Sequence, residues 1–297
     1  MIRRHKMLKN SKKVWAAALL LWLVSTLSAH DANAESSRQQ LVYEVYAGGI
    51  HAVQAKMDID LRKKGRYDLI MDAKTRGFLG SLIPWEGTFE SHGWVLKNRY
   101  QPQEHKSTAS WRKEIDIKEY IYNKNGSFKS LRITDEKRKN ELKEIPNEVT
   151  NGTVDALTAT LEILKNYNKT GKCEGQSDVF DGKRSFKQIF KHEKDVTLEK
   201  SKYNIYGGPA AECTVEVVPV KGAWHKKPRG WLSIQEQGRA KGTMPTVWVA
   251  QMTKNGPAVP VKIRVKTEYG TLFMHLAEYQ NADTILVADK RVTEEED

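Results

Sequence analysis

The chain has 297 residues, of which 49 are Lys or Arg and 37 are Asp or Glu, so its formal net charge at pH 7 is +12. The basic residues alternate with acids and match no recognisable nucleic-acid module, which excludes nucleic-acid binding as a leading function. With two cysteines, forty residues apart, the chain also lacks the C-x-x-C pairs from which zinc sites are commonly built.

Residues 1–34 are predicted to be a cleaved secretory signal peptide. Six Lys and Arg residues precede the apolar run VWAAALLLWLVSTL at 14–27, and Ala32-Asn33-Ala34 has the pattern of a cleavage site. The alternative is a membrane anchor, but this run is shorter than the roughly twenty residues that a spanning helix requires. No later stretch is apolar enough to span a bilayer. We therefore expect a periplasmic mature protein with no stable membrane span.

Residues 1–34 hold six of the basic residues and one of the acidic ones, so the remainder of the chain has a net charge of +7. A moderately basic surface of this kind suits contact with anionic components of a cell envelope. The length suits one or two domains, and no linker-like segment divides the chain. We predict a single β-rich domain over residues 35–280 and an acidic, disordered tail over residues 281–297.

Apolar and polar residues alternate through much of the region from 41 to 134, which is typical of antiparallel strands with one dry face. At 66–75, for example, Tyr67, Leu69 and Met71 fall on one face, opposite Asp68 and Asp72. Gly48-Gly49 and Lys124-Asn125-Gly126 are the expected turns. The pattern resumes after residue 178, so the fold class predicted is mainly β: a long, curved, half-open antiparallel sheet wrapped around one helix.

The segment GFLGSLIPW at 77–85 interrupts this alternation, because it is apolar but rich in Gly and Pro. We predict that it forms neither a regular strand nor a regular helix. One interpretation is a hydrophobic plug that closes one end of the sheet. The other is a lid over a cavity, since apolar ligands commonly bind at apolar loops beside a sheet. The candidate ligand-binding residues are Phe78, Leu79, Leu82, Ile83 and Trp85.

A helix is predicted from Thr153 to Tyr167, with Thr153 as the N-cap. Val154, Leu157, Leu161 and Leu164 recur at helical spacing and form one apolar stripe. A single amphipathic helix among strands is expected to pack into the hollow of the curved sheet and to bury this stripe.

Cys173 and Cys213 are predicted to form a disulfide, because an exported protein with two cysteines is expected to oxidise them. Strands expected at 178–190, 196–205 and 212–218 place both residues at one end of the sheet. The crosslink closes a loop of about forty residues, which in the loop-entropy model stabilises the fold by on the order of 4 kcal/mol. The alternative is thiol chemistry, which usually has a C-x-x-C motif.

Six short motifs occur in an order that resembles one family: VDALT at 154–158, Cys173, VFDGKR at 179–184, GGPAAEC at 207–213, VWVA at 247–250 and PVKI at 260–263. Together they resemble the exported bacterial proteins of unknown function grouped as DUF3108, over about Leu41 to Tyr279. The resemblance implies a periplasmic protein whose half-open sheet is wrapped around a helix, similar to the lipoprotein-carrier (Lol) proteins. It implies no catalytic residues. The basic segment from Gly222 to Trp231 has no counterpart, and its role stays open.

No motif for a serine hydrolase, a zinc protease or a phosphate-binding loop is present, so we predict no catalytic residues, no metal site and no cofactor. His192 and His225 are more typical of surface histidines than of metal ligands. The leading interpretation is a non-enzymatic envelope protein that holds a lipid or a lipoprotein acyl chain between sheet and helix. The alternatives are an envelope-integrity protein that contacts proteins or peptidoglycan, and a hydrolase with an unfamiliar site.

Overall fold

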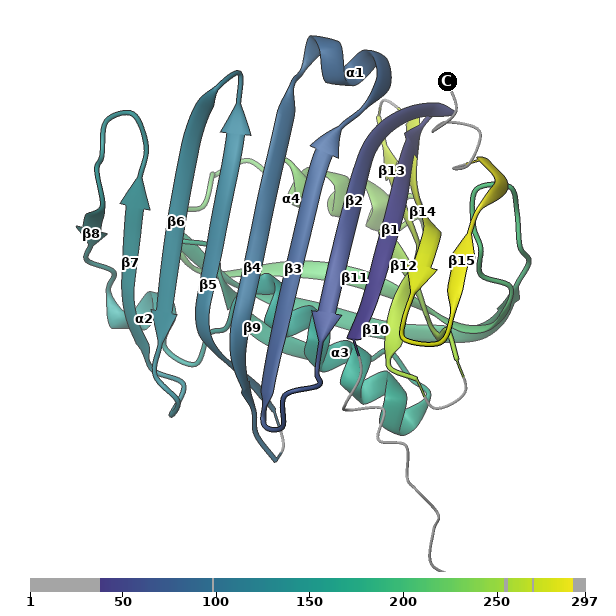
Figure 1. The fold of residues 1–297 in the computed structure, drawn as a ribbon. Coiled ribbons are helices and arrows are strands. Elements are labelled where there is room, and N and C mark those ends of the chain that lie inside the picture. The colour runs from purple at the N-terminus through teal and green to yellow at the C-terminus, as the bar shows by residue number, and fades with distance from the viewer. Residues whose placement is uncertain (1–37, 98, 254–255, 269, 291–297) are drawn as a thin grey trace, which may run out of the picture. The chain divides into compact units, whose positions relative to one another are not determined.

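A computed structural model describes residues 38–97, 99–253, 256–268 and 270–290 (Figure 1). The predicted signal peptide and its cleavage site lie outside these residues, as do residues 291–297. Within the described part of the chain, no helix combines the length and the apolarity needed to cross a membrane.

Fifteen strands form one antiparallel sheet, and four short or medium helices accompany it in the described residues. The strands are β1 (Arg38–Ala47), β2 (Ile50–Asp60), β3 (Arg66–Thr75), β4 (Trp85–Val95), β5 (Tyr100–Trp111), β6 (Glu114–Tyr122), β7 (Phe128–Thr134), β8 (Glu141–Lys143), β9 (Gly175–Phe180), β10 (Arg184–Leu198), β11 (Gly208–Gly222), β12 (Thr246–Gln251), β13 (Ala258–Thr267), β14 (Gly270–Gln280) and β15 (Ile285–Val287). The helices are α1 (Gly77–Leu82), α2 (Asn147–Thr150), α3 (Ala156–Thr170) and α4 (Trp231–Ala240).

Strand β1 lies in the interior of the sheet, between β2 and β14. On one side, β1 to β8 follow one another in chain order as successive hairpins. On the other side the order is β14-β13-β12-β11-β10-β9. The N-terminal strand β1 therefore pairs with β14, which is near the C-terminus, and Leu41 lies opposite Tyr279. The sheet is not closed, and β8 and β9 are its two outermost strands. This confirms the predicted fold class.

Helix α3 packs on the inner face of the sheet and contacts strands from both halves (Figure 1). Leu157 and Leu161 belong to a buried cluster that includes Tyr67 from β3 and Val261 from β13. Leu164 belongs to a neighbouring cluster with Ile163, Phe190, Val247, Cys173 and Cys213. The helix therefore fills the space between the two halves of the sheet with its own apolar side chains, as its predicted stripe indicated.

The predicted N-cap of this helix, Thr153, is wrong by two residues. The N-cap is Asp155, whose side chain accepts hydrogen bonds from the backbone N–H groups of Leu157 and Thr158. Val154 precedes the helix and instead forms an isolated parallel bridge with Val179 of β9. An aspartate caps a helix more strongly than a threonine, and this one has further partners that hold it in place. Gly171, with φ of +72°, ends the helix in the left-handed conformation that glycine favours.

Three further predictions need correction. Residues 77–82 form the short helix α1, although the segment is rich in Gly. The tail predicted to be disordered from residue 281 is ordered to residue 290, because β15 pairs with β14 and Ala288 is buried against Ala277. The strand expected at 196–205 does not exist, since β10 continues to Leu198 and β11 begins at Gly208.

The basic segment whose role was open leads into helix α4, which begins at Trp231. Within it, the Trp224 ring packs 4.2 Å from the guanidinium of Arg184 and 6.3 Å from the ring of Phe186. Gln235 of α4 is buried and forms hydrogen bonds with both backbone groups of Val217 in β11. The segment and helix therefore cover part of the C-terminal half of the sheet.

Candidate functional site

A buried polar cluster surrounds Asp155 at the start of α3. Ser91 of β4 donates to Asp155 Oδ1 (2.7 Å), Thr158 Oγ1 donates to Asp155 Oδ2 (2.6 Å), and Tyr67 OH lies 2.6 Å from Thr158 Oγ1. Burial and the Asp155 charge raise the pKa of Tyr67, so its hydroxyl stays protonated. The carboxylate thus accepts bonds from both its own helix and the sheet, and it locks α3 onto the inner face.

This cluster holds a serine, a histidine and an aspartate, but its geometry is not that of a catalytic triad. In a triad the imidazole contacts serine through one ring nitrogen and the carboxylate through the other. Here Nδ1 of His105 faces both, at 2.8 Å from Ser91 Oγ and 3.6 Å from Asp155 Oδ1. Ser91 is also fully buried. The arrangement therefore serves helix capping and packing, and it offers no support for the hydrolase alternative.

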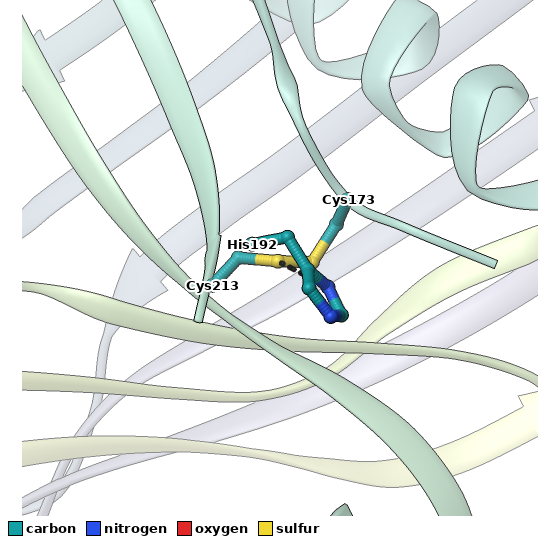
Figure 2. A group of neighbouring side chains, drawn as sticks. All are labelled: Cys173, His192 and Cys213. Atoms are coloured by element: carbon teal, nitrogen blue, oxygen red, sulfur yellow. Dashed lines mark hydrogen bonds between the residues drawn. A yellow bond between two sulfur atoms is a disulfide. The ribbon is translucent and has the colours of Figure 1, made fainter. Parts of the chain in front are cut away.

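The two cysteines form a disulfide in the C-terminal half of the sheet, on the face that α3 covers (Figure 2). Cys173 comes from the segment between α3 and β9, Cys213 lies in β11, and their Cα atoms are 6.2 Å apart. Both are fully buried. Strand β10 runs between β9 and β11, and its His192 lies directly opposite Cys213, with Nδ1 3.9 Å from the sulfur. The disulfide thus crosses one strand and brings a histidine against it.

A second candidate site lies at the edge of the sheet where α1 is found. Because consecutive strands are antiparallel, the β1–β2, β3–β4, β5–β6 and β7–β8 connections all lie at the same edge. We use the name α1 edge for this rim of strand ends and connections, which comprises residues 48–50, 76–84, 111–115 and 135–140. Most of the exposed large hydrophobic side chains in the described residues belong to it: Ile50, Phe78, Leu82, Ile83, Trp111 and Ile115.

The segment that follows helix α1 is tied to the end of β3 by the Thr75 side chain. Thr75 Oγ1 donates to the Ile83 carbonyl (2.8 Å) and accepts from the Trp85 N–H (3.0 Å). Gly77, with φ of +56°, makes the turn into the helix in a conformation that other residues rarely adopt. The short helix therefore projects its apolar side chains into solvent, and Phe78 is 69% exposed. This exposure excludes the interpretation of the segment as a buried plug.

Trp85 lines two open hollows at the α1 edge. The first, of about 520 Å³, is lined by Gly80, Pro84 and Trp85 beside three basic residues, Lys74, Arg112 and Lys113, and one acid, Glu86. The second, of about 530 Å³, has an apolar wall of Trp85, Ala109, Trp111 and Ile115, two acids, Glu114 and Asp116, and a charged rim from residues 135–138. In that rim a hydrogen bond from Arg138 lowers the pKa of Asp135 to about 2, so this carboxylate stays ionised and paired.

An apolar strip on β4 leads inward from Trp85. A Cβ atom at Gly87 would lie 2.9 Å from the Trp85 ring and 3.0 Å from the Phe89 ring, so both rings pack over this glycine. Phe89 and Met71 are only partly buried and adjoin the central core cluster. The strip therefore connects the second hollow with the apolar interior.

The turn that carries Arg112 and Lys113 is strained. Both residues have positive φ values, 51° and 77°, in a two-residue hairpin turn between β5 and β6. Such a turn favours Asn-Gly, because a side-chain Cβ in the left-handed region costs about 1–2 kcal/mol per residue. Two long basic side chains thus occupy positions where the backbone disfavours them. Strain of this kind is frequently found at functional sites.

Of the predicted ligand-binding residues, Trp85 lines both hollows, whereas Phe78, Leu79, Leu82 and Ile83 line neither. Phe78, Leu82 and Ile83 are exposed, and Leu79 is half-buried. Sequence reasoning missed Lys74, Arg112 and Lys113. Counting hairpins from β1 would have placed the turn at residues 112–113 on the same edge as residues 77–85.

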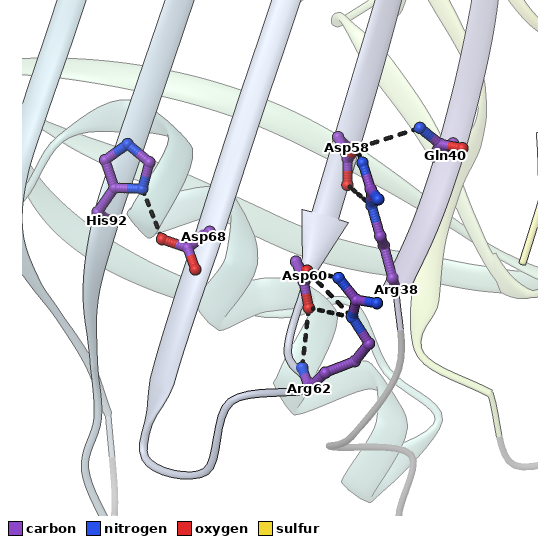
Figure 3. Close-up of polar contacts among 7 residues, drawn as sticks. All are labelled: Arg38, Gln40, Asp58, Asp60, Arg62, Asp68 and His92. Atoms are coloured by element: carbon purple, nitrogen blue, oxygen red, sulfur yellow. Dashed lines mark hydrogen bonds and ion pairs between the residues drawn. The ribbon is translucent and has the colours of Figure 1, made fainter.

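The opposite edge of the sheet is polar and basic. Its connections, at residues 61–65, 96–99 and 123–127, contain six Lys and Arg residues and no acid. On the outer face next to it, Arg38 pairs with Asp58, Arg62 with Asp60, and His92 Nδ1 lies 2.6 Å from Asp68 (Figure 3). Exposed pairs of this kind contribute little to stability, about 0–1 kcal/mol each. This face is therefore a solvated surface.

Comparison with known proteins gives a fold family and no activity. No curated protein matches the chain. A solved structure described as a β-barrel-like protein of domain of unknown function DUF1849 from Brucella abortus is similar over 84% of this chain and 100% of that one, with 9% identity and a TM-score of 0.46. The model of the family described as protein of unknown function (DUF3108) matches residues 42–277. That match spans nearly the whole sheet, and the chain belongs to the DUF3108 family.

Proposed function

We propose that this protein is a non-enzymatic cell-envelope protein that binds an anionic amphiphile at the α1 edge. The acyl chain lies along Trp85 and Phe89, and the head group lies against Arg112 and Lys113, in the turn at the end of this strip. The predicted signal peptide supports a periplasmic location. The observation that carries the proposal is that Trp85 lines two hollows at this edge, one with a basic rim and one with an apolar wall.

The position of the ligand differs from the sequence-based prediction, which put it between sheet and helix. Leu157, Leu161 and Leu164 fill that space. The apolar strip at the α1 edge adjoins the central core cluster, and its Met71 and Phe89 are only partly buried. Ligand sites commonly pair an apolar lining with a few placed polar groups, which is the combination found here.

The strained turn gives a test in which stability and binding move in opposite directions. The variant Arg112→Asn/Lys113→Gly provides the residues that the turn prefers, so we expect it to raise the free energy of unfolding by about 1–2 kcal/mol. The same variant is expected to bind the fluorescent fatty acid cis-parinaric acid more weakly, because the basic rim is lost. Lys63→Gln/Lys64→Gln removes two charges from the opposite edge and should change neither quantity appreciably.

The apolar part of the site is tested with two tryptophans on one strand. Trp85→Ala is expected to weaken binding of cis-parinaric acid about tenfold or more, since burying a large apolar side chain is worth about 1.5–3 kcal/mol. Trp94→Ala, at the far end of β4, is the matched control and should bind like the wild type. Equal affinity of the two variants, or no binding by folded wild-type protein, would contradict the proposal.

A second candidate function, contact with peptidoglycan, is favoured by the basic edge. Its three connections carry Arg62, Lys63, Lys64, Lys97, Arg99 and Lys124 without an acid. We expect this edge to retain the protein on purified sacculi at low ionic strength, and Lys63→Gln/Lys64→Gln to reduce that retention. Sacculi that retain neither protein, or both equally, would exclude the basic edge as a contact surface.

A further inference from the structure

The surroundings of the disulfide hold a third potential ligand group for a metal. The sulfur atoms of Cys173 and Cys213 and a ring nitrogen of His192 all lie within 4.8 Å of one another, the only such group of His, Cys, Asp and Glu in the described residues (Figure 2). The three residues come from three separate segments: the chain before β9, strand β10 and strand β11. Two thiolates and one imidazole are a donor set that suits a soft or borderline ion such as Zn²⁺.

The histidine is oriented as a ligand would be. Its Nδ1 lies 3.9 Å from the Cys213 sulfur, and its Nε2 lies 3.6 Å from Asp195 Oδ1. Metal-binding histidines commonly direct the second ring nitrogen toward a carboxylate, which fixes the ring and increases its basicity. Register holds the ring in place, because His192 and Cys213 are directly opposite each other in the β10–β11 pair.

The spacing also suits a tetrahedral ion. Bonds of about 2.3 Å to sulfur and about 2.0 Å to nitrogen place the ligand atoms of a zinc site roughly 3.5–3.8 Å apart. The Sγ–Nδ1 distance of 3.9 Å needs little change. The two sulfur atoms must separate after reduction, and Cα atoms 6.2 Å apart allow this by side-chain rotation. The fourth position of the ion is then open to water or to another ligand.

We propose that the reduced protein binds Zn²⁺ through Cys173, Cys213 and His192, and that the disulfide and the metal site are mutually exclusive states. A dithiol reductant transfers two electrons and two protons to the disulfide, giving two protein thiols and the reductant's own disulfide. Zn²⁺ then binds both sulfurs and releases the two thiol protons. The inference is independent of the amphiphile site, which lies at the α1 edge.

The test uses the mature protein after reduction with a phosphine, and Co²⁺ as a spectroscopic substitute for Zn²⁺. Reduced, folded wild-type protein should bind one Co²⁺ with the absorption of a cobalt–thiolate bond, and Zn²⁺ should displace it. The oxidised protein should show no such absorption. His192→Ala is expected to weaken binding more than tenfold, and Asp195→Asn about tenfold, as for other groups that orient a ligand. His92→Ala removes a half-buried histidine with an aspartate partner elsewhere and should leave binding unchanged.

Circular dichroism and a thermal melt show whether each reduced protein is folded, so that an unfolded chain is not mistaken for a site. Two results would overturn the inference. One is the absence of cobalt–thiolate absorption in reduced wild-type protein, whether folded or not. The other is equal affinity of wild type and His192→Ala, which would show that two free thiols alone hold the ion.

Discussion

Leu161→Asp is expected to prevent folding. The leucine is 4% exposed and packs with residues from both halves of the sheet. Its loss removes about 2–5 kcal/mol of packing, and a buried carboxylate without a partner adds several more. That sum is comparable with the whole stability of a typical domain, about 5–15 kcal/mol. The measurement is a denaturant titration followed by circular dichroism, in which the variant should show no cooperative transition.

The matched control is the same substitution at an exposed leucine. Leu142 of the edge strand β8 is 58% exposed, so Leu142→Asp should change the free energy of unfolding by less than about 0.5 kcal/mol. A Leu161→Asp protein that is soluble and melts cooperatively near the wild-type temperature would show that the helix stripe does not face the core.

Loss of the disulfide is expected to lower the free energy of unfolding by about 4 kcal/mol. The crosslink closes a loop with a sequence separation of 40, and the loop-entropy model assigns about this value to it. Cys173→Ala/Cys213→Ala is preferred to serine substitution, because both sites are fully buried and a hydroxyl there would lack a partner. Urea titrations of the variant and of oxidised wild type measure the difference.

Two observations check that the effect belongs to the bond. A non-reduced digest of protein purified from its native cells without a reductant should contain one linked peptide pair and no free thiol. Reduced wild type, without added metal, should unfold at nearly the same urea concentration as the double variant. Complete alkylation of both cysteines without a reductant would refute the native disulfide.

Local pattern was enough to predict much of the fold. Alternation of polar and apolar residues predicts the strands of the N-terminal half because one face of each strand is exposed to solvent. In β3, for example, Asp68 and Asp72 lie on the face opposite Tyr67 and Leu69. The stripe of Leu157, Leu161 and Leu164 marks α3 for a similar reason, since every turn of the helix faces the same core. The pairing of Cys173 with Cys213 could be predicted without knowledge of the fold, because the chain has only these two cysteines.

Features set by contacts between distant residues could not be predicted. Asp155 caps α3 in preference to Thr153 partly because Ser91, sixty-four residues earlier, donates to its carboxylate. The position of His192 beside the cysteines depends on the β10–β11 register, which alternation alone does not fix. At α1, six residues are too few for helical periodicity to appear, and the Gly and Pro content of the segment indicates a loop instead.

The position of β1 between β2 and β14 constrains the order in which the strands of this protein can pair during synthesis. A chain that emerges N-terminus first presents the hairpins from β1 to β8 early, and these need only their sequence neighbours. Strand β14 ends at Gln280, so β1 waits for its second partner until almost the entire chain has emerged. Until then one side of β1 has no strand to pair with, and non-local pairing of this kind is slow. Synthesis can therefore run far ahead of folding, so the sheet is complete around β1 only when nearly all of its strands have been made.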